Sequence, residues 1–153
     1  PLLSYSWLFN DSSEAKEDFT ELPFIFLARS LFHRSMHEMK EAEEYFGKAI
    51  SAKPNFPTAY FQMGNMFFMD KKYLKAITSW DKMINLEGEG GAFVDQAYFN
   101  IACAYSKIGD FDAAAENLRK AVAAGVDPYL VQHDPDLGEF RHDKRFQEIK
   151  GGL

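Results

Sequence analysis

The sequence predicts an all-α fold, in which antiparallel helix pairs stack into a solenoid that ends in a helical cap. Apolar residues recur at spacings of three and four in successive segments, as on the buried face of a helix. The segments come in pairs separated by short polar turns, and the pairs repeat along the chain. One amphipathic pair buries too little apolar surface to be stable alone, so neighbouring pairs must pack against each other.

Residues 57–90 contain the clearest pair. In its first helix, Met63 and Phe67 share a face with Gly64, which is small enough for a neighbouring helix to come close. A turn at residues 70–72 follows. The second helix continues the same rhythm with these residues: Tyr73, Ala76, Ile77, Trp80, Met83 and Ile84.

Equivalent residues occur in three successive second helices. Ala42, Ala76 and Ala114 are 34 and then 38 residues apart. A large apolar residue follows each alanine after four positions: Phe46, Trp80 and Leu118. In the first helices, a large-x-x-large-small-x-x-aromatic pattern begins at Tyr60 and again at Tyr98. This pattern, with its period of about 34 residues, resembles the tetratricopeptide repeat.

The resemblance implies a right-handed solenoid with a concave peptide-binding groove and no chemistry of its own. It covers three helix pairs, at residues 21–56, 57–90 and 94–126. In the first pair, Arg29 and His33 stand where the repeat usually has apolar residues.

A glycine-rich loop at residues 88–91 accounts for the longer spacing between the second and third pairs. A phosphate-binding loop would need a following Lys-Ser or Lys-Thr, and Glu89 would repel a phosphate. We therefore expect a plain loop insertion.

The two ends of the chain differ in character. Residues 1–20 are predicted to form an apolar arm, which includes Tyr5, Trp7 and Phe9, followed by a short helix. The arm either packs over the chain's own first pair or groove, or inserts into a partner. Residues 127–153 are predicted to form the cap, with an inner face listed as follows: Tyr129, Leu130, Leu137, Phe140, Phe146 and Ile149. The ending DPDLGEFRHDKRF is also similar to the tail of plastid and bacterial tetratricopeptide-repeat assembly factors.

The resemblance implies that the first helix of each pair lines the groove. The corresponding residues are Phe24, Leu27, Leu31 and Arg34, then Phe61, Gln62, Asn65, Phe68 and Met69, then Phe99, Asn100, Cys103, Ser106 and Lys107. Asn65 and Asn100 match the asparagines of members that clamp a chaperone's C-terminal carboxylate, but apolar Leu27 and Phe61 occupy basic positions. A desolvated anion needs a paired charge, so we expect no such clamp.

What remains is an aromatic and methionine-lined trough, which suits an apolar or amphipathic protein segment. The repeat's own core does not use Phe61, Phe68, Met69 or Phe99. We therefore expect a partner or the arm to cover them, and we expect binding to respond little to salt because few charges line the trough.

The sequence does not indicate a catalytic site or a metal site. His33 and His37 lie four residues apart with Glu38 next to them, but His37 falls in a turn and a third ligand is missing. Cys103 is expected to be a small core residue. We therefore predict no enzyme activity, no cofactor and no metal.

The net charge of −6 argues against nucleic acid or an anionic membrane as partner. A single cysteine excludes an internal disulfide and suits a reducing intracellular compartment, either cytoplasmic or, after removal of a targeting peptide, plastid or mitochondrial. No apolar run approaches the roughly 20 residues that span a bilayer.

Together these features predict a non-catalytic interaction scaffold, with assembly factor as one such role. The alternative is a permanent structural subunit of a larger complex, associated with an organellar membrane and joined through the arm.

Overall fold

The computed structural model describes residues 19–153, and this part of the chain contains helices and loops but no strand. A short 3-10 helix, η2 (Phe19–Glu21), precedes three helix pairs. These are α1 (Leu22–Ser35) with α2 (Met39–Ala52), α3 (Pro57–Met69) with α4 (Tyr73–Glu87), and α5 (Val94–Ile108) with α6 (Phe111–Ala124). Residues 1–18, which include the predicted arm and most of the short helix predicted to follow it, lie outside the described residues.

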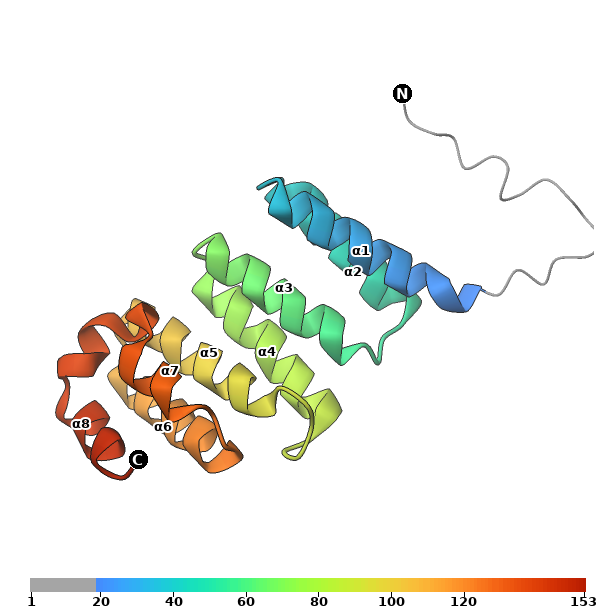
Figure 1. Ribbon diagram of the computed structural model, residues 1–153. Coiled ribbons are helices and arrows are strands. Elements are labelled where there is room, and N and C mark those ends of the chain that lie inside the picture. Colours follow the sequence, from blue (N-terminus) through green and yellow to red (C-terminus); the bar gives the residue numbers. More distant parts are fainter. Residues whose placement is uncertain (1–18) are drawn as a thin grey trace, which may run out of the picture.

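The three pairs stack side by side along the molecule (Figure 1). The two helices of each pair pack extensively on each other, while α2 contacts α3 and α4 contacts α5 to join one pair to the next. The junction between α4 and α5 is the more extensive of the two. The predicted all-α solenoid is thus confirmed.

A left-handed residue ends the first helix of every pair. His37, Lys71 and Gly109 have φ angles of 59°, 57° and 88°. The next residue then donates its backbone N–H to a carbonyl five positions earlier, as Lys72 does to Phe67 over 2.8 Å. This Schellman closure satisfies carbonyls that the helix end leaves free and turns the chain back on itself.

The repeated alanines belong to the packed core. Ala42, Ala76 and Ala114 are fully buried. Gly64 also marks a close approach, and its neighbour is the indole of Trp80, which a Cβ atom at Gly64 would overlap. A glycine in α3 therefore makes room for the largest side chain of α4.

The polar residues of the first pair are accommodated by Tyr45. Arg29 donates to the Tyr45 hydroxyl over 3.1 Å. The His33 ring stacks on Tyr45 at 5.2 Å, and its Nδ1 lies 2.6 Å from Glu38 Oε2. Hydrogen bonding thus replaces the apolar packing that the repeat pattern predicts here.

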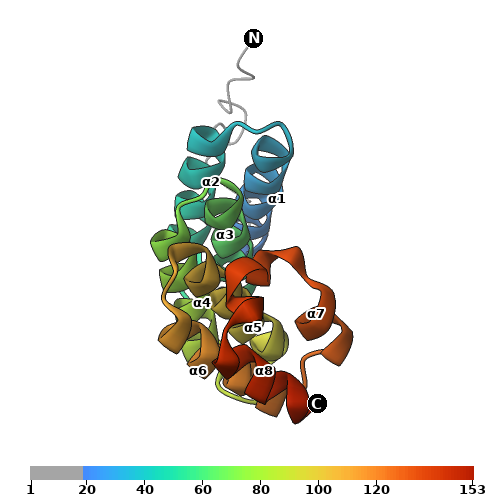
Figure 2. The same ribbon diagram turned by 90° about the vertical axis from the view of Figure 1, so that its left-hand side faces the viewer.

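The cap consists of α7 (Pro128–His133), the 3-10 segment η3 (Pro135–His142) and α8 (Lys144–Gly151). Each begins at an aspartate whose side chain accepts a backbone N–H two residues on: Asp127, Asp134 and Asp143. η3 packs on α5 and α8 packs on α6 (Figure 2).

The inner face of the cap differs from the prediction at one residue. Leu137, Phe140, Phe146 and Ile149 are buried and Leu130 is partly buried, but Tyr129 is 65% exposed. Tyr129 lies in the first turn of α7, where its ring stacks outside on His133 at 4.2 Å. Val131 is buried in its place.

Candidate peptide-binding groove

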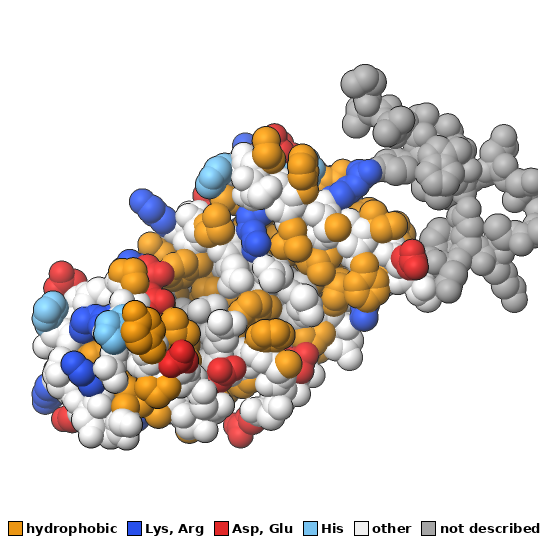
Figure 3. Space-filling view, viewed as in Figure 1, with side chains coloured by type: hydrophobic (Ala, Val, Ile, Leu, Met, Phe, Trp, Pro, Cys, Tyr) orange, Lys and Arg blue, Asp and Glu red, His pale blue; other side chains and the backbone are white. Residues whose placement is uncertain are grey.

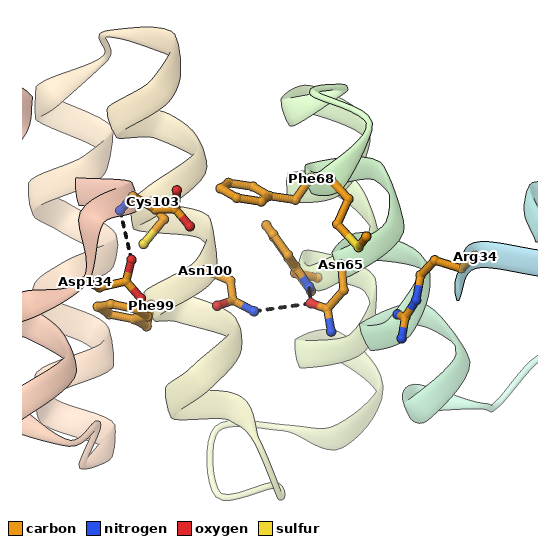
Figure 4. Close-up of a pocket in the computed structure, with 10 residues that line it drawn as sticks. Arg34, Asn65, Phe68, Phe99, Asn100, Cys103 and Asp134 are labelled. Carbon is orange, nitrogen blue, oxygen red and sulfur yellow. Dashed lines mark hydrogen bonds between the residues drawn. The ribbon is translucent and has the colours of Figure 1, made fainter. Parts of the chain in front are cut away.

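A cavity of about 340 Å³ lies on the inner face of the stack, between the helix pairs and the cap (Figure 4). Its lining residues come from α1, α3, α4, α5 and the cap: Arg34, Asn65, Phe68, Met69, Trp80, Phe99, Asn100, Cys103, Asp134 and Asp136. Seven of these are among the groove residues that the sequence predicts. In the space-filling view, apolar side chains spread across this face with a few charged ones among them (Figure 3).

Helix α3 provides the open part of this cavity. Met69 is 51% exposed. Phe68 is partly buried, because its ring lies 5.9 Å from Trp80 and 5.3 Å from Tyr73. This wall thus combines a fixed aromatic ring with a flexible, exposed methionine.

Two asparagines connect α3 to α5 at the centre of the cavity. Asn65 Oδ1 accepts from Trp80 Nε1 at 3.2 Å and from Asn100 Nδ2 at 3.4 Å (Figure 4). Within the described chain, no hydrogen bond uses the amide nitrogen of Asn65 or the amide oxygen of Asn100. The amide nitrogen of Asn65 can therefore donate to a bound backbone, and the amide oxygen of Asn100 can accept from one.

The α5 side of the groove is covered by the chain itself. Phe99 and Cys103 are 3% and 4% exposed, and the Ser106 hydroxyl donates to the Leu137 carbonyl at 2.7 Å. The expectation that a partner or the arm covers Phe99 is therefore wrong, because η3 packs on α5 and buries it. Phe99 and Cys103 line the cavity with very little exposed surface.

Burial also favours the protonated thiol form of Cys103. Removal from water raises the pKa of the thiol well above its ordinary value, and the charges of Asp134 and Asp136 raise it further. Burial and the raised pKa both disfavour the thiolate, which is the nucleophilic form of cysteine. Cys103 therefore serves as a small apolar residue beneath the cap.

The remaining predicted groove residues lie outside the cavity. Leu27 belongs to the buried core, which corrects its placement in the groove, and Leu31 and Phe61 pack partly against that core. Phe24 is half exposed, with its ring 5.1 Å from Phe56. Gln62 does not line the cavity, but it accepts a hydrogen bond from the lining residue Arg34.

Sequence reasoning missed three lining residues: Trp80, Asp134 and Asp136. Trp80 was assigned to the core, which is also correct, since it is 1% exposed. Asp134 caps η3, and nothing in the sequence shows that η3 returns to α5. Arg34 and the two aspartates are the charged residues that line the cavity.

Within residues 19–153, no three His, Cys, Asp or Glu side chains gather as a metal site would require. None of the described helices is long and apolar enough to cross a bilayer.

A family model of the tetratricopeptide repeat matches residues 25–56 and 95–124. The central pair, which has the clearest repeat pattern, lies between the two matched segments. No sequence among curated proteins matches this chain significantly.

Solved structures share the fold at low sequence identity. The N-terminal domain of stress-induced protein-1 (STI-1) from C. elegans is 18% identical, with a TM-score of 0.70 over 84% of this chain and 99% of that one. BtubC (BKLC) from P. vanneervenii is 20% identical, with a TM-score of 0.74 over 92% and 64%. The first TPR of Spaghetti (RPAP3), bound to the HSP90 peptide SRMEEVD, is 15% identical, with a TM-score of 0.64 over 83% and 92%.

Proposed function

Because the chain is a tetratricopeptide-repeat protein, we propose that it is a non-catalytic scaffold that holds an apolar or amphipathic segment of a partner protein in the cavity between α1, α3 and α5. The assembly of a larger complex is one role that such a scaffold would serve.

The observation that carries this proposal is the open α3 wall of the cavity. Neither the repeat packing nor the cap covers Met69, and the free amide groups of Asn65 and Asn100 lie beside it. Such a surface offers apolar contact to a side chain and hydrogen bonds to a backbone, which is what an extended or helical segment requires.

A chaperone-type C-terminal carboxylate is a poor fit to this cavity. The Spaghetti domain has the same fold and binds an acidic peptide, but here Asp134 and Asp136 line the cap end of the cavity. A terminal carboxylate at that end would meet like charges. We therefore assign an internal segment to the groove rather than a chain terminus.

A photo-crosslinking residue at position 69 of the full chain tests this proposal in an extract of the cells that produce it. We expect crosslinks to one defined segment of a partner, identified by mass spectrometry. The matched control carries the crosslinker at Leu74, which is 68% exposed on α4 and does not line this cavity.

Met69→Asp should weaken binding of the identified segment at least about ten-fold, because it places a charge in an apolar contact. Equal crosslinking from positions 69 and 74 would argue against a groove ligand. Crosslinks to residues 1–18 of the same chain would show that the arm, and not a partner, occupies the groove.

A second candidate function, permanent subunit of a complex, is favoured by the outer face of α1. Ile25, Phe32 and the C-cap residue Met36 are spaced by seven and then four residues, which places them on one face, and they are 50%, 60% and 58% exposed. The terminal helix of a solenoid needs a polar outer face or a cover. A partner subunit packed on α1 would supply that cover.

Sedimentation of the isolated chain separates the two candidates. A permanent subunit without its partner should self-associate at micromolar concentration, and Phe32→Ser with Met36→Ser should restore the monomer. A monomeric wild-type chain would leave the scaffold as the better account.

A further inference from the structure

The charges of the cavity are unevenly distributed along it. Arg34 lies at the α1 end, while Asp134 lies at the cap end (Figure 4). Asp136 also lines the cavity. Between the two ends, the asparagines and the aromatic residues are uncharged. A bound segment therefore meets a cation at one end and carboxylates at the other.

Arg34 is a partly buried cation without an anion. Its Nη1 donates to Gln62 Oε1 at 2.8 Å and more weakly to the Gln62 carbonyl at 3.4 Å, and both acceptors are neutral. No carboxylate among residues 19–153 lies within ion-pair distance of its guanidinium. Partial burial also lowers the pKa of Arg34, and no nearby acid offsets this effect. An arginine in this setting gains the most from an anionic ligand.

The carboxylates of the cap end are already satisfied. Asp136 pairs with Lys107 at 3.0 Å. Asp134 accepts the backbone N–H of Asp136 at 2.8 Å and thereby caps η3. Arg34 is thus the cationic lining group, and the described chain supplies no carboxylate to pair with it.

From this arrangement we propose that the segment in the groove carries an aspartate or glutamate side chain that pairs with Arg34, followed toward the cap by apolar residues that contact Phe68 and Met69. The inference rests on the proposed scaffold function and specifies its ligand. The charges also set its direction, because the acidic residue points toward α1 and away from Asp134.

Gln62 acts as a positioning residue in this arrangement. It holds Nη1 of Arg34 over α3 and leaves Nε and Nη2 without a hydrogen bond to the described chain. Two parallel donors in this geometry match the two oxygens of a carboxylate.

The test selects displayed random peptides of about twelve residues on the full chain. Parallel selections use Arg34→Gln and a matched control, Arg119→Gln, whose arginine lies on α6 away from the cavity. We expect the wild type and the control to enrich an acidic residue at a fixed distance from an apolar pair. Arg34→Gln should lose the acidic preference, whereas Arg34→Lys should retain part of it.

One selected peptide then enters a double-mutant cycle. Replacing its acidic residue by the matching amide should weaken binding to the wild type roughly ten-fold and leave binding to Arg34→Gln nearly unchanged. Raising salt from about 50 mM to about 500 mM should weaken only the binding that depends on the pair. Circular dichroism of each variant checks that the helices remain intact.

The outcomes separate this inference from the scaffold function. Peptides that bind the groove without an acidic preference, or that bind Arg34→Gln equally well, overturn the inference and leave the scaffold in place. A wild-type chain that selects no peptide sensitive to Met69→Asp overturns the scaffold function and this inference with it.

Discussion

Helices α3 and α5 present equivalent repeat positions, 38 residues apart, to the inner face of the stack. Phe61 corresponds to Phe99, and Asn65 to Cys103. On α3 these residues are partly exposed, whereas on α5 they are buried beneath η3. The comparison teaches that the position in the repeat sets the direction of a side chain, while the next layer of structure decides whether it forms a binding surface or a core.

The largest expected effect tests this comparison directly. Phe99→Ala should lower the free energy of unfolding by about 3–4 kcal/mol, because it leaves a cavity between α5 and the cap. Phe61→Ala removes a partly exposed ring and should lower it by about 1–2 kcal/mol. Urea denaturation measures both values, and equal losses would show that the two inner faces are equivalent after all.

A second prediction concerns the contact between the two helices inside the second pair and its equivalent in the third pair. Gly64 faces Trp80, whereas the equivalent Ala102 belongs to a pair with Leu118. Gly64→Ala should cost about 1–3 kcal/mol despite alanine's better helix propensity, since its Cβ would displace the indole.

Adding Trp80→Leu to Gly64→Ala reproduces the combination of the third pair. The double variant should therefore be more stable than the sum of the single effects predicts, which thermal and urea unfolding of all four proteins would show. Strictly additive effects would mean that Gly64 is required for another reason.

The smallest expected effect concerns the ion pairs of Arg145, which join the cap to α6. The side chain and backbone N–H of Arg145 lower the pKa of Asp143 to about 2, and Arg145 also pairs with Asp112 of α6. Because the folded pKa is lowered, this stabilisation is complete above the ordinary aspartate pKa and is lost as pH falls from about 4 to about 2.

Asp143→Asn keeps a good helix cap but removes the charge. The variant should therefore be slightly less stable than the wild type at neutral pH, and the difference should vanish near pH 2. Urea denaturation across this pH range measures it. A difference that persists in acid would mean that the ion pair contributes nothing.

The sequence predicted the helices and their pairing well, because these depend on short-range patterns. Ala42 and Phe46, which the repeat pattern predicts on the packed face of their helix, are both fully buried in α2. The turns at His37, Lys71 and Gly109 follow from local backbone closure. The candidate groove was predicted in part: Asn65, Phe68 and Met69 do border one cavity.

Only the tertiary structure decided which of these inner residues remain open. Leu27 and Phe99 have the same periodicity as lining residues, yet one joins the core and the other lies beneath η3. Their burial depends on segments distant in the chain, and a helical repeat pattern carries no information about where a non-repeating cap returns. The absence of an ion-pair partner for Arg34 also depends on the tertiary structure. It can be recognised only when every residue that surrounds the guanidinium in space is known. Local periodicity thus determined the solenoid, and packing between distant segments determined its groove.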